Sequence, residues 1–325
     1  MSVRLGFIGT GGIAQSHMQR FSEMADVEMV AFCDVAFDRA TAAADKFGGK
    51  AYSDYKVMYD AEKLDGVCIC TPPFAHGGLE TIACGKGIHL FIEKPVAIDM
   101  KMARPICDAI QKAGIVSVVA YKYRWDDHVN KAREMLAGKS IGLVFGNFWG
   151  GLPGTAWWRV QNQSGGQFVE QTTHIVDMAR YLCGDVVQVQ AFCAKQAMAA
   201  HHENFDIADA ASANLLFASG AVGNISNTCM LKNWGQSSLR VMAHEFTLEI
   251  AGHRLSWTGD ESGEYMLQKD GYLGEDTAFV ESIKAGKPVG VNSDYADACK
   301  SLAVSVAVNE SCARGGAVVD TAELG

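Results

Sequence analysis

The stretch Phe7-Ile-Gly-Thr-Gly-Gly-Ile-Ala-Gln-Ser-His17 holds three glycines within four residues, between an apolar run and a segment of helical spacing. Gly9, Gly11 and Ala14 match the pattern G-x-G-x-x-G/A. In that pattern the first glycine permits a tight turn, the second lets a ligand approach the backbone, and the third position keeps helix and strand close. The N-terminus of the following helix offers N–H groups and partial positive charge to a pyrophosphate. The stretch therefore predicts a strand, a dinucleotide-binding turn and a helix.

Further apolar runs follow along the first 121 residues, separated by segments of helical length. These runs are Glu28–Cys33, Gly66–Cys70, His89–Ile92 and Val116–Ala120. Alternation of buried strands with helices indicates βαβ units and a parallel sheet covered on both faces. We expect residues 1–121 to form a doubly wound, dinucleotide-binding Rossmann domain.

The second half of the chain has a different pattern. Its alternating stretches are Ala211–Phe217, Ala221–Ser226, Leu239–Met242 and Phe246–Ile250. Such alternation favours an antiparallel sheet with helices on one face. A length of 325 residues also suggests about two domains. We therefore predict an α/β protein in which residues 122–325 form an α+β domain that binds substrate and mediates oligomerisation.

Composition limits the partners. There are 28 basic and 37 acidic residues, a net charge of −9, so nucleic acid is not an expected partner. No apolar run reaches the roughly 18 residues that a membrane span needs, and Met1 to Arg4 leads into a strand without a secretory signal. We expect a cytoplasmic protein. Its ten cysteines lack CxxC pairs, and we interpret them as reduced, buried and small apolar residues.

Asp34 ends the second predicted strand about 20 residues beyond Ala14, where a carboxylate accepts hydrogen bonds from ribose hydroxyls and repels a 2′-phosphate. NAD is therefore favoured over NADP. Arg39 can in principle accommodate that phosphate, but its simpler interpretation is an exposed helix residue. The predicted cofactor-binding residues are Gly9, Thr10, Gly11, Gly12, Ile13, Asp34, Arg39, Thr71, Pro72, Pro73, His76, Glu93 and Lys94.

Two groups of these cofactor-binding residues, one at Thr71–His76 and one at Glu93–Lys94, stand at the carboxyl ends of predicted strands, where the ligands of parallel sheets lie. In Thr71-Pro-Pro-Phe-Ala-His76 the proline pair can form a wall for the cofactor, although a stiff turn explains it equally. In Glu93-Lys94-Pro95 the lysine can stabilise an alkoxide as a hydride leaves its carbon.

A third cluster, Glu170, His174 and Asp177, has spacings of four and three, which place the side chains on one helix face. His174 suits a general base because its pKa lies near working pH and a carboxylate can orient its ring. A histidine packed in the core is the alternative. We predict Lys94, His174 and Glu170 as catalytic residues.

The fingerprint at Gly9, the Thr71-Pro-Pro turn with His76 and Glu93-Lys94-Pro95 together resemble the glucose-fructose oxidoreductase and inositol dehydrogenase family, called Gfo/Idh/MocA. The segments Gly165–Asp177, Phe279–Pro288 and Tyr295–Ala313 are similar to its later motifs, so that the resemblance covers nearly the whole chain. It implies a Rossmann domain joined to a domain with a large, mostly antiparallel sheet, and activity on sugars or polyols. It also implies a homodimer or homotetramer. Glu170 departs from the family, which usually has aspartate there, so its role stays open.

Trp157-Trp158-Arg159 follows the loop-like Gly150–Pro153 and suggests a substrate site. An indole can stack on a sugar ring, and Arg159 can bind hydroxyl, carboxylate or sulfonate oxygens. Equally, one tryptophan can belong to the core and the other to a subunit contact. The predicted substrate-binding residues are Lys94, Arg124, Trp157, Trp158, Arg159, Glu170, His174 and Asp177, of which Arg124 follows from the resemblance. No metal is expected, because His201-His-Glu203 has no second cluster at ligand spacing.

The leading hypothesis is an NAD-dependent oxidoreductase that transfers a hydride between the nicotinamide and a sugar, polyol or sugar acid. A second hypothesis, by resemblance, is a glycosidase or lyase that uses transient oxidation and yields no net NADH. A third is a sugar sensor that binds dinucleotide without turnover. The presence of both Lys94 and His174 argues against the sensor.

Overall fold

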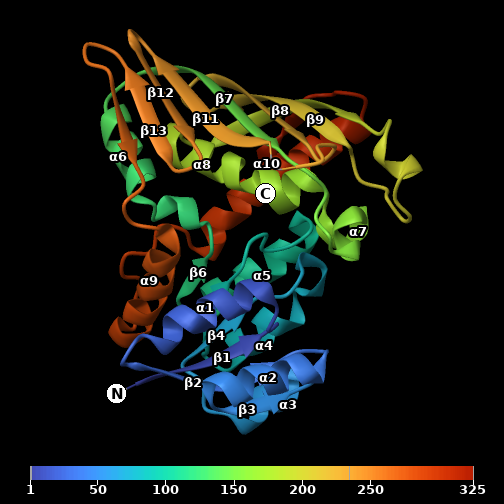
Figure 1. Cartoon of the computed structure of the whole chain (residues 1–325), viewed down its shortest axis with the longest axis vertical. Helices are drawn as coiled ribbons and strands as arrows, with labels where there is room; N and C mark the ends of the chain where they lie inside the picture. Colours follow the sequence, from blue (N-terminus) through green and yellow to red (C-terminus); the bar gives the residue numbers. More distant parts are fainter. Residues whose placement is uncertain (1, 234, 325) are drawn as a thin grey trace. The chain divides into compact units, whose positions relative to one another are not determined.

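The computed structural model describes residues 2–233 and 235–324 (Figure 1). The chain divides into two compact units. Unit 1 comprises residues 1–97, 101–122 and 271–297, and unit 2 comprises residues 98–100, 123–270 and 298–325. We describe each unit by itself.

Unit 1 is built on a six-stranded sheet in the order β3-β2-β1-β4-β5-β6, with every adjacent pair parallel. The strands are β1 (Val3–Ile8), β2 (Val27–Cys33), β3 (Lys50–Tyr52), β4 (Gly66–Ile69), β5 (His89–Ile92) and β6 (Ser117–Val119). The helices between them are α1 (Gly12–Ser22), α2 (Phe37–Phe47), α3 (Tyr55–Ala61), α4 (Gly78–Gly85) and α5 (Met100–Ala113). The predicted Rossmann sheet is confirmed. Only β3 was missed, because its three residues are partly or fully exposed.

The register aligns the carboxyl ends of the central strands. Ile8 of β1 pairs with Cys33 of β2 and with Ile69 of β4, and Ile69 pairs with Ile92 of β5. The loops that follow these four strands therefore start at one edge of the sheet, which is the ligand-binding edge of doubly wound folds.

Unit 1 also takes a segment from late in the chain, helix α9 (Gly271–Ala285) and the residues up to Asp297. The sequence assigned all of 122–325 to the second domain, and this assignment differs from the compact units. The physical reason is packing. The ring of Phe279 lies 5.7 Å from that of Phe91. A Cβ on Gly66 would lie 2.7 Å from Ile283 and 2.8 Å from Phe279, so the glycine lets these two side chains of α9 pack closely on β4.

Unit 2 is built on a nine-stranded sheet in the order β14-β13-β12-β11-β7-β10-β9-β8-β15. The strands are β7 (Ile141–Trp149), β8 (Val186–Ala194), β9 (Ala210–Phe217), β10 (Val222–Thr228), β11 (Gln236–Ala243), β12 (Phe246–Ala251), β13 (Arg254–Thr258), β14 (Gly263–Met266) and β15 (Val319–Asp320). Adjacent strands are antiparallel except for β7 and β10. The predicted large, mostly antiparallel sheet is confirmed.

One face of this sheet carries the core of unit 2. Helices α6 (Asp127–Leu136), α8 (Thr173–Cys183) and α10 (Tyr295–Ala313) cover it in Figure 1. Val129, Ile175 and Val304 from these helices pack with Leu239 and Leu215 of the sheet. Burial of this apolar surface is the main stabilising contribution to the unit.

One interpretation of the cysteines is wrong. Cys193 of β8 and Cys312 of α10 form a disulfide, with Cα atoms 5.6 Å apart, whereas the sequence predicted ten reduced thiols. The pair is separated by 119 residues and joins a strand to the helix packed against it, so spacing along the chain carried no signal. Nearby, Ser311 Oγ donates to Ala317 O at 2.6 Å and accepts the Ala191 N–H at 2.8 Å.

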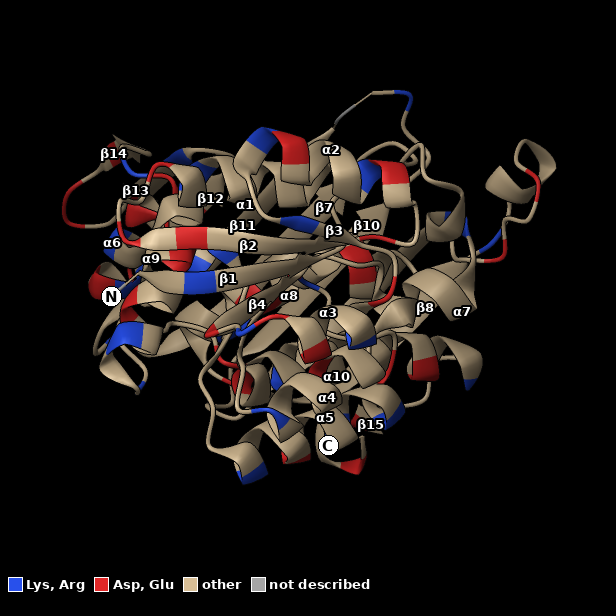
Figure 2. Cartoon of the chain, turned by 90° about the horizontal axis from the view of Figure 1, so that it is seen from below, with Lys and Arg blue, Asp and Glu red and all other residues tan. Residues whose placement is uncertain are grey.

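Basic and acidic residues are interspersed along the chain. In the cartoon of Figure 2, segments coloured for lysine and arginine alternate with segments coloured for aspartate and glutamate. Among residues 2–233 and 235–324, none of the helices combines the length and apolar character needed to cross a membrane.

Candidate active site

The turn after β1 has an open side. Gly9 has φ of +83°, and a Cβ there would lie 2.6 Å from Cys70 O, so both conformation and space require glycine. At Gly11 and Gly12, by contrast, a Cβ would meet no described atom within 4 Å. Packing within the chain therefore gives no reason for glycine at these two positions, and the space above them suits the close approach of a dinucleotide phosphate to the backbone.

Asp34 follows β2 and is 9% exposed. Its Oδ2 accepts the backbone N–H of Thr10 at 2.9 Å and the Thr10 hydroxyl at 3.1 Å, while Oδ1 accepts the N–H of Ala36 at 2.9 Å. A carboxylate has about four acceptor positions, so roughly one is left for a ribose hydroxyl. Asp34 thus also holds the glycine turn in place. Arg39 is exposed on α2.

Exposed apolar side chains line the start of the loops at this edge. Ile13 is 37% exposed, Val35 96%, Phe37 50% and Phe74 40%, and they follow β1, β2 and β4. A flat aromatic base is the kind of ligand that such apolar surface accommodates. The sequence predicted Ile13 but missed Val35, although an apolar residue directly after the strand-ending Asp34 was a usable signal.

The turn after β4 is rigid. His76 is buried, with Nδ1 2.5 Å from Glu80 Oε1, and Glu80 Oε2 accepts the N–H of Gly77 at 2.7 Å. Pro73 is buried, whereas Pro72 is partly exposed. The buried hydroxyl of Thr71 has no hydrogen-bond partner among the described residues. His76 therefore stabilises the turn, and Thr71 offers an unused polar group beside Gly9.

Glu93 and Lys94 follow β5 at the same edge. Glu93 is 7% exposed, and its Oε2 accepts the backbone N–H of Lys94 at 3.0 Å. The Lys94 side chain is partly buried. In the sheet order β5 stands two strands from β1, which is about 10 Å at normal strand spacing. The lysine predicted as catalytic thus lies at the edge that carries the glycine turn.

Behind this edge lies a polar cluster of which the sequence predicted only Glu93 as a site residue. It consists of the buried His17, Glu93, Glu275 and Asp276 and the partly exposed Arg20, and it joins α1, the end of β5 and α9. His17 is completely buried, with Nδ1 2.6 Å from Asp276 Oδ1 and Nε2 3.1 Å from Glu93 Oε1. Besides Glu93 at its strand end, the sequence offered His17 only as the end of the glycine stretch, since its partner Asp276 is 259 residues away.

In unit 2 the predicted catalytic pair lies on two kinds of helix. Residues Phe168–Thr172 form a π-helix that contains Glu170, and α8 follows with His174 in its first turn. A π-helical turn is rare and occurs mostly at functional sites. His174 is partly buried, with its ring 5.3 Å from that of Tyr123. Glu170 Oε2 accepts the indole N–H of Trp158 at 2.8 Å, so this glutamate orients the Trp157-Trp158-Arg159 segment.

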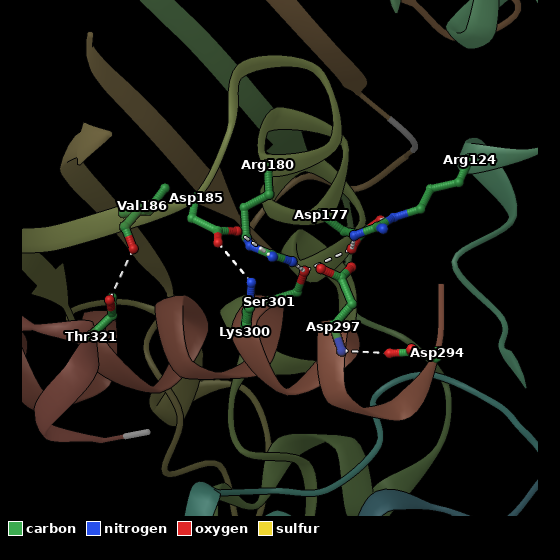
Figure 3. Close-up of polar contacts among 10 residues, drawn as sticks. All are labelled: Arg124, Asp177, Arg180, Asp185, Val186, Asp294, Asp297, Lys300, Ser301 and Thr321. Carbon is green, nitrogen blue, oxygen red and sulfur yellow. Dashed lines mark hydrogen bonds and ion pairs between the residues drawn. The ribbon is translucent and has the colours of Figure 1, made fainter. Parts of the chain in front are cut away.

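Asp177, the third member of that helix face, is buried in an ion pair (Figure 3). Arg124 donates from Nε and Nη2 to its two oxygens at 2.8 and 2.6 Å, and Ser301 Oγ donates to Oδ1 at 2.7 Å. Arg180 then binds Ser301 and Asp185, which extends the network. Arg124 is 4% exposed and Asp177 1%. This geometry favours a structural role for both residues over the predicted contact with substrate.

The two tryptophans differ in environment. Trp158 is 1% exposed and packs with Phe205 and Ile207, whereas Trp157 lies only partly buried at the edge of that cluster. Arg159 is partly exposed, and its buried Nε has no hydrogen-bond partner in the part of the chain that the structure describes. Trp158 is thus a core residue that Glu170 holds, and Trp157 and Arg159 have surface to offer a ligand.

The parallel sheet, the open glycine turn, the carboxylate of Asp34 at the end of β2 and Lys94 after β5 are features of a dinucleotide-binding domain. Residues 3–121 match the family described as an oxidoreductase family with an NAD-binding Rossmann fold. Residues 129–254 match the C-terminal domain of the same family. The chain belongs to the Gfo/Idh/MocA oxidoreductase family.

Relatives and solved structures agree with this assignment. The chain is similar to myo-inositol 2-dehydrogenase of Thermotoga maritima, with 27% identity over 90% of this chain and 91% of the relative. It is 30% identical to inositol 2-dehydrogenase of Rhizobium meliloti over 70% of this chain and 69% of the relative. A structure of levoglucosan dehydrogenase with NADH and levoglucosan has the same fold, with a TM-score of 0.88, 21% identity and coverage of 98% of this chain and 99% of that chain.

Proposed function

We propose that the protein is an NAD-dependent dehydrogenase of a sugar, polyol or sugar acid. The observation that carries the proposal is the position of Lys94 at the sheet edge where Gly11 and Gly12 leave open space. Relatives named as inositol dehydrogenases support the substrate class.

The residues of this chain have distinct roles in the proposed reaction. The bound nicotinamide supplies the hydride acceptor. Lys94 holds the substrate oxygen and stabilises the negative charge that develops there. His174 takes the hydroxyl proton, because imidazole is the side chain that most often serves as a general base and this one is partly exposed. Glu170 is a positioning residue that fixes Trp158 and thereby presents Trp157 and Arg159 to the substrate.

The preference for NAD over NADP is assigned to Asp34. Its carboxylate stands directly after β2 and repels a 2′-phosphate, while the exposed Arg39 has freedom to turn away. Asp34→Ala should reduce the ratio of kcat/KM for NAD to that for NADP. Tighter binding of NADP by the unaltered protein would refute the assignment.

The decisive experiment records absorbance of NADH while inositols, aldoses, sugar acids and glycosides are supplied with NAD or NADP. Net NADH that appears with a polyol or sugar, and that Lys94→Ala reduces by orders of magnitude, supports the proposal. Glycoside cleavage without net NADH would identify the elimination mechanism instead. Dinucleotide binding without turnover of any compound would identify a sensor.

The proposed homo-oligomer uses the uncovered face of the nine-stranded sheet. A groove of about 510 Å³ crosses β7, β8, β9 and β10, and its described lining residues carry no charge. Phe145 is 47% exposed and Val222 50%, beside amide side chains such as Asn214 and Gln190. A surface of exposed apolar and uncharged polar side chains suits contact with a second copy of the chain. In a two-fold interface each copy buries this same face against the other.

We propose a cytoplasmic location, because turnover requires a pool of free nicotinamide dinucleotide. The Cys193–Cys312 disulfide is unusual for a compartment that keeps thiols reduced. Cell fractionation tests the location. Recovery of the protein in the cytoplasmic fraction supports it, and recovery in an oxidising compartment would contradict it.

A further inference from the structure

His17 connects two carboxylates inside unit 1. Its Nε2 lies 3.1 Å from Glu93 Oε1, and its Nδ1 lies 2.6 Å from Asp276 Oδ1. The ring is walled by Phe91, whose centroid lies 4.8 Å away in an edge-to-face contact. A completely buried ring with both nitrogens engaged has one orientation available to it.

Glu93 passes this constraint to Lys94. One oxygen of Glu93 faces His17, and the other accepts the backbone N–H of Lys94 at 3.0 Å. The carboxylate is 7% exposed, so water does not compete effectively for these positions. The placement of His17 therefore decides where Glu93 lies, and Glu93 decides where the Lys94 backbone lies.

Asp276 is held from the other side. Arg20 Nε lies 2.5 Å from Asp276 Oδ2, and Arg20 also stacks over the ring of Tyr272 at 4.8 Å. Lys122 faces the same ring at 4.1 Å. These contacts connect α1, α9 and the loop after β6 into one support behind the carboxyl edge of the sheet.

The donor atoms of His17, Glu275 and Asp276 lie within 4.8 Å of one another, which is also a spacing for metal ligands. A proton fits this cluster better than a metal ion. Both nitrogens of His17 lie at hydrogen-bond distance from carboxylate oxygens, so neither ring nitrogen is left over to bind a metal ion. Burial lowers the pKa of His17, but the bonds to Asp276 and Glu93 outweigh it and raise the pKa from 6.5 to about 9.

The remaining acid completes a balanced set of charges. Burial, followed by the nearby Glu93 and Asp276, raises the pKa of Glu275 well above its usual range, which favours its neutral form. Two cations, His17 and Arg20, then face two carboxylates, Glu93 and Asp276. A buried group of this kind is stable only while each member keeps its partner.

We propose that His17 is a positioning residue for Lys94, acting through Glu93 and anchored by Asp276 and Arg20. The proposal rests on the function proposed above, in which Lys94 stabilises charge on the substrate oxygen. A lysine ammonium on a flexible stem gains precision when the backbone that carries it is fixed, and small displacements at a reacting centre lower rates strongly.

The test compares His17→Gln, Lys94→Ala and the double variant, with His89→Gln as matched control. His89 is half-buried at the opposite end of β5, where its Nδ1 accepts the N–H of Val116 at 3.0 Å. We expect His17→Gln to lower kcat about 10- to 100-fold, with the Kd for NADH changed less than about threefold. In the Lys94→Ala background, His17→Gln should change kcat less than about twofold, because the group on which it acts is gone.

Two results would overturn the proposal when Lys94→Ala shows its expected loss. One is a normal kcat for His17→Gln. The other is a double variant whose fold-loss in kcat equals the product of the losses in the two single variants. An unchanged kcat for Lys94→Ala would instead remove the proposed role of Lys94 and the positioning role with it. If His17→Gln does not fold, Asp276→Asn gives a second readout. NMR of the 15N-labelled His17 ring should show that Asp276→Asn lowers the pH at which this ring loses its proton. The alkaline limb of the kcat profile should shift by the same amount, and a limb that does not move with the His17 titration would contradict the proposal.

Discussion

Replacing Arg124 by methionine tests whether the Arg124–Asp177 pair is structural or binds substrate. Methionine fills much of the volume but removes both donors, which leaves the carboxylate of Asp177 buried at 1% exposure with Ser301 as its neutral donor. Breaking a buried, bidentate ion pair in this way costs about 3–5 kcal/mol of unfolding free energy. For a unit of 150–250 residues, each kcal/mol lowers Tm by about 2–4 °C, so we expect a decrease of roughly 6–20 °C.

Differential scanning calorimetry measures the decrease, and steady-state kinetics on the best substrate measures KM. Arg240→Met is the matched control in the same unit, because Arg240 pairs with Glu249 at 2.9 Å on the surface with 48% of its side chain exposed. That pair should contribute less than about 1 kcal/mol. A Tm within 2 °C of the unaltered protein together with a tenfold higher KM for Arg124→Met would refute our reasoning and restore Arg124 to the substrate site.

Four further outcomes are expected. The stability that His17 contributes is complete below pH 6.5 and is lost as the pH rises through about 9, a change of about 3 kcal/mol. The free energy of unfolding measured with urea should therefore fall over this range for the unaltered protein and stay constant for His17→Gln. Glu170→Asp should lower kcat/KM and Tm, because the shorter side chain withdraws from the Trp158 indole that it positions. An unchanged kcat/KM and Tm would make Glu170 a spectator. Phe145→Glu should shift sedimentation toward the monomer, and an unchanged oligomer would exclude that sheet face. Cys193→Ala opens a loop of 119 residues and should lower stability by up to about 4–5 kcal/mol, as judged by denaturant midpoints.

Local patterns in the sequence were enough to predict much of the fold. The strand at Leu5–Ile8, the glycine turn and the helix after it form a contiguous unit whose periodicity and φ requirement are written in neighbouring residues. The same holds for the alternating strands Ala211–Phe217 and Phe246–Ile250. Short, partly exposed β3 and the interrupted first unit carried no such signal, because the packing of Phe279 against Gly66 depends on residues far apart in the chain.

The sequence predicted which residues belong to the candidate site, but not which side chains these residues contact. Lys94 and Asp34 follow from strand ends, where chemistry and topology coincide. The partners of Glu170 and Asp177 depended on three-dimensional packing, since helical spacing says which side chains share a face and not what lies opposite. Trp158 opposite Glu170 and Arg124 opposite Asp177 therefore had to come from the structure.

The late segment that completes unit 1 has a consequence for how the protein is made. While a ribosome synthesises the chain, residues 1–122 emerge long before Asp276, and during that interval His17 and Arg20 lack their acceptor and Gly66 lacks its cover. The nascent Rossmann sheet therefore lacks these contacts until the late segment is made, and incompletely packed intermediates of this kind expose apolar surface. For the same reason, a gene cut after residue 122 would yield an incomplete cofactor unit, and any transplant of that unit to another enzyme must bring residues 271–297 along.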